Sequence, residues 1–360
     1  MRIAVDVMGG DKAPHQIVLG CLEAVRRIDE LPGVDQIVMV GKEDAVKAEL
    51  AKCRASLGEH LAFVQASESI DMDEAPAAAV RKKKDNSLTR CMELVKSGEA
   101  QAMVSAGNSG AFAAAALFTL GRIKGVTRPI IATVLPTRGE KPIIVADAGA
   151  NMDCAPEWMA QFAIMGGVYA EKVIGSGDRP KIGLVNIGTE ECKGNEFTHE
   201  AFKHLREAGV NFVGNVQGHD LFKGELDVAV CDGFVGNIIL KTTESVAKAI
   251  AYWIKAAVKS SVLSMLGALL MKGSFAKLKK RMDPERYGGA ILLGVDGNCI
   301  VTHGAATHKA IFYAIQVAAN ATKNELGPTI ASRIRAYNEK VAERKAAEEE
   351  AKAAEALAKI

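Results

Sequence analysis

Seven apolar runs, spread along 360 residues, most strongly limit what this chain can fold into. Most of the runs lead into a glycine or a small polar residue and then into a helical pattern. Strands that are apolar along their whole length are covered on both faces, which is typical of a parallel sheet between helices. The runs therefore predict a doubly wound, three-layer α/β/α fold with a mainly parallel sheet. They are RIAVDV (2–7), QIVMVG (36–41), AMVSAG (102–107), PIIVADAG (142–149), KIGLVNIG (181–188), LDVAVCDG (226–233) and CIVTHG (299–304).

The chain shows no repeat and no proline-rich linker in its first 230 residues. We therefore expect residues 1–330 to form one α/β/α domain. Within it, residues from about 238 to 285 have a long helical pattern, which predicts a helical arm rather than part of the sheet. Residues 331–360 consist of strong helix formers with mixed charge, and predict a charged, alanine-rich C-terminal helix that carries no site.

Charge and cysteine content narrow the class of protein. The 45 basic and 43 acidic residues leave a net charge of +2, which gives no reason to expect nucleic-acid binding, since that needs concentrated Lys and Arg. The 7 cysteines are odd in number, scattered and never spaced C-x-x-C, which fits a reducing compartment and argues against a disulfide framework. The first residues enter a strand without a charged, then apolar, leader, so we expect a cytoplasmic protein.

Six loops that follow the apolar runs carry the candidate site residues. Ligands of open parallel sheets bind beyond the carboxyl ends of the strands, where helix N-termini favour anions. Any one loop could equally be a turn or a helix cap. Neither G-x-G-x-x-G nor the Walker pattern occurs, so we expect a small anion in one shared pocket. The loops are DVMGGD (6–11), SAGNSGA (105–111), DAGANMD (147–153), NIGTEECKGN (186–195), CDGFVGN (231–237) and HGAATH (303–308).

Lys193 is the strongest candidate in these loops, because an ammonium beside helix-opening amides can bind phosphate or the oxyanion of an acyl transfer. It could equally pair with Glu190 or Glu191 on the surface. Asn237 could donate from its amide or cap a helix. His303 could act as an acid or base, bind phosphate, or be a core histidine. Cys231 is the one plausible thiol nucleophile, because it ends a predicted strand. The alternative is a buried strand cysteine without a catalytic role, which is the common case.

Two surface features suggest partners. A basic cluster could meet an acidic protein or be a solvated helix face; it consists of Arg81, Lys82, Lys83 and Lys84. The stretch SSVLSMLGALLM (260–271) is too short to cross a bilayer and is bracketed by lysines. It could lie on an anionic membrane, or be buried in a homodimer or a helical hairpin. Its apolar residues are Leu263, Met265, Leu266, Leu269, Leu270 and Met271.

The series of motifs along roughly residues 1 to 325 resembles the bacterial phosphate acyltransferase (PlsX) family. One such string would be weak, whereas the whole series in this order is specific. The motifs include DVMGGD, VRKKKDNS, LVKSGEAQAMVSAGNSGA, RPIIATVLPT, DAGANMDC, LVNIGTEECKGN, DVAVCDGFVGNIILKTTE and YGGAILLGVDG.

The resemblance implies an enzyme in which inorganic phosphate attacks the thioester of acyl-acyl carrier protein, giving acyl phosphate for phospholipid synthesis. No metal or other cofactor is then required. It also implies a homodimer, associated peripherally with the inner face of the cell membrane, which supplies a downstream glycerol-3-phosphate acyltransferase. The carrier protein would dock on the basic cluster, and catalysis would fall to Lys193, Asn237 and His303. Binding of phosphate and substrate would involve Gly9, Gly10, Asp11, Ser105, Asn108, Ser109, Asp147, Asn151 and Thr189.

Three other functions stay open from the residues alone. The first is a phosphate acetyltransferase-like enzyme that uses short acyl-CoA. The second is a hydroxyacid dehydrogenase on a related fold, and the third is a non-catalytic, membrane-associated scaffold of lipid synthesis. Acyl phosphate formation from a long-chain carrier-bound donor would separate all three from the activity that the resemblance implies.

Overall fold

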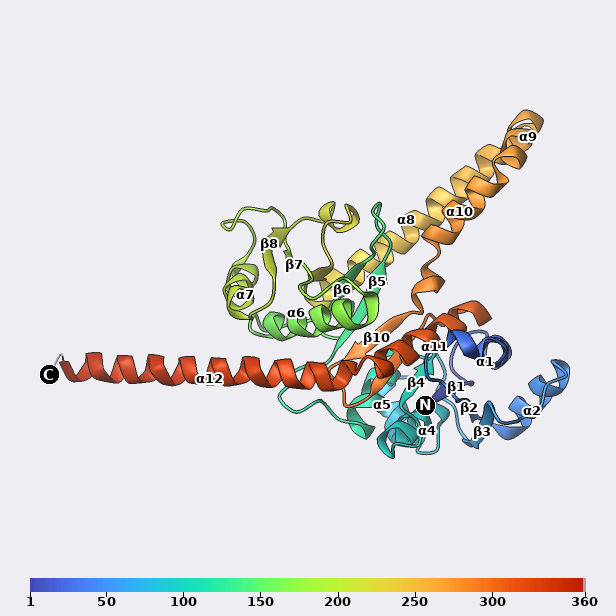
Figure 1. Ribbon diagram of the computed structural model, residues 1–360, viewed down its shortest axis with the longest axis horizontal. Helices are drawn as coiled ribbons and strands as arrows, with labels where there is room; N and C mark the ends of the chain where they lie inside the picture. Colours follow the sequence, from blue (N-terminus) through green and yellow to red (C-terminus); the bar gives the residue numbers. More distant parts are fainter. Residues whose placement is uncertain (359–360) are drawn as a thin grey trace.

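One mixed sheet forms the centre of the molecule in a computed structural model, of which residues 1–358 are described (Figure 1). Within these residues the sheet has eleven strands in the order β3-β2-β1-β4-β11-β10-β5-β6-β9-β7-β8. In chain order the strands are β1 (Arg2–Asp6), β2 (Gln36–Gly41), β3 (Leu61–Gln65), β4 (Ala102–Ser105), β5 (Ile130–Leu135), β6 (Ile143–Ala146), β7 (Ile182–Val185), β8 (Phe212–Val216), β9 (Val228–Val230), β10 (Ala290–Leu293) and β11 (Asn298–Val301).

The sheet consists of two parallel halves. One half contains β3, β2, β1, β4 and β11, and the other contains β6, β9, β7 and β8. Between them, β10 runs antiparallel to β11 and to β5, and β5 runs antiparallel to β6. The prediction of an α/β fold with a mainly parallel sheet is therefore confirmed, and each of the seven apolar runs overlaps a strand.

Helices cover both faces of the sheet, because alternate side chains of each buried strand need apolar partners on opposite faces. In β1, for example, Ile3 and Val5 belong to one core cluster and Ala4 to another, and all three are wholly buried. The main helices are α1 (His15–Arg26), α2 (Glu43–Lys52), α3 (Pro76–Lys82), α4 (Ser87–Lys96), α5 (Ser109–Thr119), α6 (Trp158–Tyr169), α7 (Glu196–Glu207), α8 (Gly233–Lys259), α9 (Val262–Leu270), α10 (Lys272–Met282), α11 (His308–Lys323) and α12 (Leu326–Ala358).

Each face has its own set of helices. Residues of α1, α6, α7, α11 and the start of α12 share the largest core cluster with one face of both halves. On the other face, α4 and α5 pack on the first half, and the first turns of α8 pack on the second half through Val235, Ile239 and Leu240. This is the three-layer arrangement that the apolar runs predicted.

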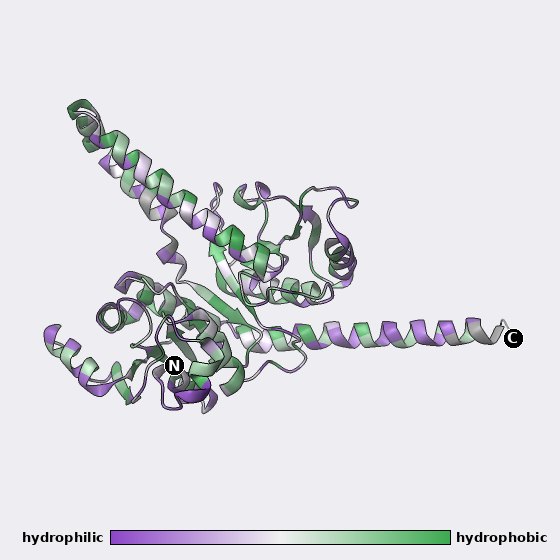
Figure 2. Ribbon diagram, turned by 180° about the vertical axis from the view of Figure 1, so that it is seen from behind, coloured by the Kyte–Doolittle hydropathy of each residue, from purple (hydrophilic) through white to green (hydrophobic). Residues whose placement is uncertain are grey.

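The helical arm leaves the body as α8, turns at α9 and returns as α10 (Figure 1). It begins at Gly233, a few residues before the predicted start near 238. Its tip is strongly apolar (Figure 2), with Leu263 and Leu270 exposed by 80% and 90%. Arg281 anchors the returning helix by donating to the backbone oxygen of Arg138 at 2.6 Å. Within residues 1–358 no single helix is long and apolar enough to cross a membrane, although α8 and α9 pass that test as a pair bent by 117°.

The C-terminal helix α12 is longer than predicted. It starts at Leu326 rather than at 331, and its first turns pack against α6 and α11. Ile330 and Ile334 are buried there. From about residue 345 the helix leaves the body and projects as a single charged helix (Figure 1). The last two residues of the predicted segment, 359 and 360, lie outside the described residues.

Candidate functional site

The six candidate loops form two groups, because the strand direction reverses between the two halves of the sheet. We call each line of strand ends along the sheet a rim. The loops 6–11, 105–111 and 303–308 follow β1, β4 and β11 and lie on one rim, the His303 rim. The loops 147–153, 186–195 and 231–237 follow β6, β7 and β9 and lie on the opposite rim, the Lys193 rim. The expectation that one chain gathers all six loops in one pocket is therefore wrong: three antiparallel pairings separate them.

Lys193 lies exposed in a loop whose backbone accepts two side-chain hydrogen bonds. Asn186 Nδ2 donates to the backbone oxygen of Lys193 at 3.1 Å, and Asn215 Nδ2 donates to the backbone oxygen of Glu190 at 3.1 Å. The aliphatic part of Lys193 lies against Gly188, where an added Cβ would stand 2.8 Å from Lys193 Cγ. Among the described residues the ammonium has no ion pair, so the alternative of a surface pair with Glu190 or Glu191 does not occur.

The same loop opens helix α7. Asn195 caps this helix by accepting from Thr198 N at 2.9 Å, and Thr198 Oγ1 accepts from Asn195 N at 2.9 Å. Gly194, with a φ of +111°, connects the cap to Lys193. Thr189 is exposed in the same loop, four residues before Lys193.

Asp147 organises the neighbouring loop from within. Its carboxylate is wholly buried and accepts from the backbone N–H groups of Ile131, Gly149, Ala150 and Asn151 and from Asn151 Nδ2, at 2.7 to 3.1 Å. Burial raises the pKa of Asp147, and these hydrogen bonds oppose that rise. Since all its acceptor positions are used, Asp147 shapes the loop and has no free oxygen for a ligand, which corrects its predicted place among the binding residues.

Asn237 lies one turn inside α8 and faces the Asp147 loop. A Cβ on Gly149 would stand 3.5 Å from Asn237 Cβ. The cap of α8 is Asp232, whose side chain accepts from Val235 N at 2.8 Å, so the helix-cap alternative for Asn237 is wrong. The half-buried amide of Asn237 has no hydrogen-bond partner among residues 1–358. The Lys193 rim thus combines an ammonium on the loop after β7 and an amide on the helix after β9, neither of which has a partner in the part of the chain that the structure describes.

Cys231 is not a plausible nucleophile in this group. Its side chain is buried, and its thiol lies 3.6 Å from the backbone oxygen of Asp147. Burial and the nearby carboxylates of Asp232 and Asp147 raise the pKa of Cys231 well above its ordinary value. Because the thiolate is the nucleophilic form, the buried-strand alternative holds.

The His303 rim is organised by a second buried carboxylate, Asp6. It accepts from Ser87 Oγ at 2.6 Å and from Ser105 Oγ at 2.7 Å, while Ser105 Oγ accepts from Gly107 N at 3.0 Å. Burial raises the pKa of Asp6, and its hydrogen bonds oppose that rise. Ser105 is therefore a buried positioning residue rather than a surface ligand. An added Cβ on Gly9 would stand 2.6 Å from Asp6 Oδ2, so only glycine allows this close approach.

The other predicted residues of this rim lie around the same network. Asp11 N donates to Gly304 O at 2.8 Å, which brings the loops of Gly10 and His303 together. Asn108 caps α5, which begins at Ser109, and its amide donates to the backbone oxygen of Met72 at 2.9 Å.

His303 is exposed, so the core alternative for it is wrong. Its Nδ1 accepts from Ala305 N at 3.0 Å. Because it lies on its own rim, one chain does not bring His303 together with Lys193 and Asn237.

The basic cluster lies beside the His303 rim. Arg81 and Lys82 end helix α3, and the chain continues through Lys83 and Lys84 to Ser87, which binds Asp6. Lys83 forms an ion pair with Glu74 and donates a hydrogen bond to the backbone oxygen of Ser69. Of the four predicted docking residues, Arg81, Lys82 and Lys84 are exposed.

Comparison with known proteins identifies the family. Residues 1–327, which include every candidate site residue, match the family model described as "Fatty acid synthesis protein". A phosphate acyltransferase of Pelotomaculum thermopropionicum is 47% identical over 335 residues, covering 93% of this chain and 95% of the relative. One of Heliobacterium modesticaldum is 49% identical over 319 residues, with 88% and 93% covered. The chain belongs to the phosphate acyltransferase (PlsX) family.

Solved structures place this family member among proteins of one fold. A phosphotransacetylase from Streptococcus pyogenes is 17% identical, with a TM-score of 0.62 over 90% of this chain and 94% of that chain. A branched-chain phosphotransacylase from Enterococcus faecalis is 13% identical, with a TM-score of 0.56 over 89% and 99%. At these identities the likeness supports the fold alone.

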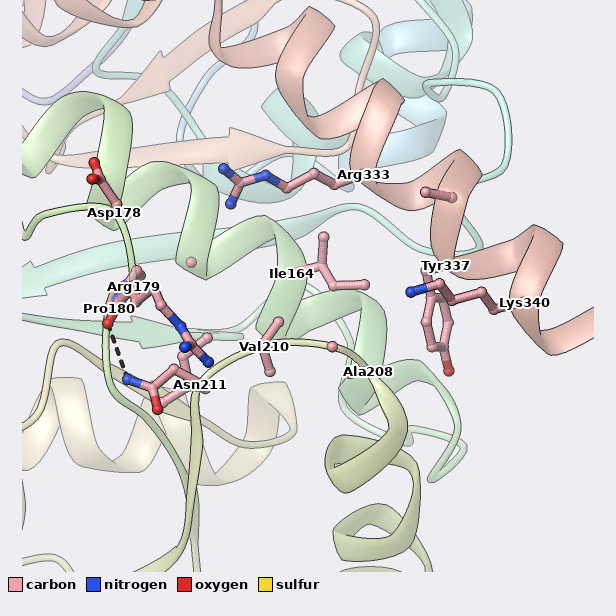
Figure 3. Close-up of a pocket in the computed structure, with 14 residues that line it drawn as sticks. Ile164, Asp178, Arg179, Pro180, Ala208, Val210, Asn211, Arg333, Tyr337 and Lys340 are labelled. Carbon is pink, nitrogen blue, oxygen red and sulfur yellow. Dashed lines mark hydrogen bonds between the residues drawn. The ribbon is translucent and has the colours of Figure 1, made fainter.

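One cavity of this phosphate acyltransferase family member is lined by none of the six candidate loops (Figure 3). It has a volume of about 330 Å³ and lies between α6, the loop before β8 and α12. None of the predicted site residues lines it. Its walls include Ile164, Arg179, Val210 and Tyr337 (Figure 3).

Sequence reasoning gave no individual role to three residues that shape the rims: Asp6 and Gly194, which lie in the candidate loops, and Ser87. A charged residue inside the apolar run RIAVDV was the available signal for Asp6, because a buried carboxylate needs donors nearby. Ser87 and Gly194 carry no comparable signal, since their roles depend on contacts with residues elsewhere in the fold.

Proposed function

We propose that this chain transfers a fatty acyl group from acyl-acyl carrier protein to inorganic phosphate, giving acyl phosphate for phospholipid synthesis, and that phosphate binds at the Lys193 rim. This proposal depends on two donors at that rim that have no partner among the described residues: the Lys193 ammonium and the Asn237 amide. A cation and a neutral amide suit a phosphate dianion and the oxyanion that forms beside it. The names of the relatives, which describe acyl transfer to phosphate, support the same reaction.

The reaction needs positioning more than acid or base chemistry. A phosphate oxygen attacks the thioester carbonyl carbon, a C–O bond forms, and the carbonyl oxygen becomes an oxyanion. The oxyanion then collapses, the C–S bond breaks, and the thiolate leaves and takes a proton from water. Since a thiol has a pKa of about 8.5, it leaves readily near neutral pH. We assign phosphate binding to Lys193 with Thr189, and oxyanion stabilisation to Asn237. Asn151 shapes the loop instead, because its side-chain amide donates to Pro129 O at 2.8 Å and to Asp147 Oδ2 at 2.9 Å.

The carrier protein docks, in this proposal, at the basic cluster beside the His303 rim. Acyl carrier proteins are acidic, and Arg81, Lys82 and Lys84 present exposed positive charges. His303 and the Gly9–Asp11 loop then contact the donor near its point of entry. Because the two rims are opposite in one chain, we propose that a homodimer lets a carrier docked on one copy deliver its thioester to Lys193 of the other.

The apolar tip of the arm would hold the enzyme on the inner face of the cell membrane, where a glycerol-3-phosphate acyltransferase consumes the product. Leu263, Leu269 and Leu270 are among its most exposed residues, and Lys259 and Lys272 flank them. Apolar side chains flanked by lysines suit an anionic lipid surface.

Mass spectrometry provides the direct test. Purified protein with palmitoyl-acyl carrier protein and orthophosphate should release acyl phosphate and carrier thiol. Lys193→Ala should lower turnover at low phosphate by roughly 100-fold, because it removes a preorganised charge. Lys203→Ala, which removes a lysine that pairs with Glu200 on the outside of α7, should leave it unchanged. Wild-type turnover by Lys193→Ala would rule out the assignment of that residue.

Donor choice tests the substrate class. Efficient turnover of acetyl-CoA, with none of palmitoyl-acyl carrier protein, would favour the short-chain phosphate acetyltransferase alternative. Absence of thiol release from every donor would favour the non-catalytic scaffold.

Mixed dimers test delivery between copies. Lys193→Ala protein is co-expressed with protein carrying Arg81→Glu, Lys82→Glu and Lys84→Glu. If delivery crosses the dimer, the mixed dimer retains one working combination of docking cluster and lysine, and turnover returns. If both functions must lie in one copy, the mixture stays inactive.

A further inference from the structure

The Lys193 rim carries four exposed apolar side chains that the assignment of phosphate binding leaves unexplained. They are Met152, Ile187, Phe234 and Ile238, exposed by 47%, 79%, 58% and 49%. All four come from the loops or helix that follow three neighbouring strands, β6, β7 and β9. We name this set the apolar rim patch.

Backbone contacts bring the members of the patch close to one another. Gly233 N donates to Asn151 O at 2.7 Å, which places Phe234 beside Met152. Leu184 pairs with Val230 in adjacent strands, so the loop of Ile187 runs next to the start of α8. The patch therefore spans the ends of three strands.

The patch also adjoins the proposed donors of the reaction. Phe234, Asn237 and Ile238 are spaced i, i+3 and i+4 on α8, so Asn237 shares a helix face with the two apolar residues. Ile187 is six residues before Lys193 in the same loop. The apolar rim patch is therefore adjacent to the positions proposed for the phosphate and the oxyanion.

We infer that the apolar rim patch binds the hydrocarbon chain of the acyl donor and sets the preference for long chains. This inference rests on the proposed function. An acyl chain attached to the reacting carbonyl must leave the reaction centre along an adjacent surface, and apolar side chains there remove its methylenes from water. A patch exposed in the free protein is then covered in the complex.

A chain-length series tests the inference. We expect kcat/KM of the wild type to rise from butanoyl to palmitoyl carrier protein, because each methylene buried by the patch can contribute up to roughly four-fold. Phe234→Ala with Ile238→Ala should lower kcat/KM for the palmitoyl donor by at least about ten-fold and change the butanoyl donor less than about two-fold. Alanine keeps the helix propensity of α8. Val213→Ala with Leu57→Ala, two exposed apolar residues elsewhere, should behave as the wild type.

Two other outcomes overturn the inference. An equal fall for all donors would mean that the two residues support the reaction centre and not the chain. Loss of the dimer in the double variant, measured by light scattering, would assign the patch to the contact with a second copy.

Chain binding without turnover separates failure of the inference from failure of the proposed function. Wild-type protein should bind the fluorescent fatty acid cis-parinaric acid, and the double variant should bind it at least about ten-fold more weakly. If the wild type makes no acyl phosphate but shows this difference, the inference stands and the proposed function fails. If acyl phosphate forms and neither binding nor the chain-length series responds to the variant, the inference alone fails.

Discussion

Two buried aspartates give the rims their shape. Asp6 and Asp147 each follow or end an apolar strand, and each accepts hydrogen bonds from groups of its own rim. A buried carboxylate is costly unless its oxygens are satisfied, so the surrounding donors have few alternative arrangements. Such residues fix the backbone that a ligand meets without touching the ligand.

Asp147→Asn should destabilise the protein by about 3 kcal/mol, because one acceptor oxygen becomes an amide that faces N–H donors. Urea unfolding would measure this loss as a lower midpoint. Asp153→Asn is the matched control, since Asp153 is exposed in the same loop and should leave the midpoint unchanged. Equal midpoints for the two variants would contradict the organising role of Asp147.

Helix α7 and the Lys193 loop form one unit at the scale of elements. The capping box of Asn195 and Thr198 begins the helix directly after Gly194. A Cβ on Gly194 would stand 2.1 Å from Thr198 Oγ1 and 2.8 Å from Asn186 Oδ1. The glycine is therefore required by close packing as well as by its positive φ.

Gly194→Ala should reduce acyl phosphate formation strongly, because it displaces the cap and the loop that positions Lys193. Gly209→Ala is the matched control. Gly209 also has a positive φ, +72°, but no heavy atom lies within 4 Å of an added Cβ, so this variant strains the backbone without displacing a neighbour. Both variants should lose about 1 kcal/mol from backbone strain in urea unfolding, and Gly194→Ala about 1 kcal/mol more from the lost cap. Similar turnover by the two variants would argue against a role for the loop geometry.

The tip of the helical arm provides the second prediction at this scale, which concerns membrane association. Leu266→Glu with Leu270→Glu should reduce association with anionic liposomes in a flotation assay and leave turnover in solution largely intact, since both residues are exposed far from the rims. Leu57→Glu with Val213→Glu adds the same charge to exposed apolar positions of the body and should not change flotation. Loss of the dimer instead would place the tip in a subunit interface.

At the scale of the whole molecule, helix α12 has two parts: a first part that packs on the body, and an end, after Arg344, whose described side chains are exposed. Arg344 pairs with Glu207 on α7, and the described side chains of residues 345–355 are exposed. Upstream, Ile334 is wholly buried and Arg333 pairs with Glu171 at 2.5 Å. Stability should therefore depend on the first part of α12 and not on its end.

A stop after Lys345 should leave the melting temperature and turnover unchanged while lowering the helical signal in circular dichroism. A stop after Ala331 should lower the melting temperature clearly, because it removes Ile334 from the core. Destabilisation by the shorter deletion would mean that the projecting helix contacts the body or a second copy.

The sequence by itself determined the class of fold and the residue types of both rims. Continuous apolar runs must be covered on two faces, and the loops after them carry glycines and donors wherever the chain folds them. Which loops meet was decided by β5 and β10, which were not among the predicted strands. Each lies antiparallel to both its neighbours, so His303 and Lys193 end on opposite rims. Strand direction depends on pairing between residues far apart in the chain, and a local apolar pattern does not determine which strands pair or in which direction.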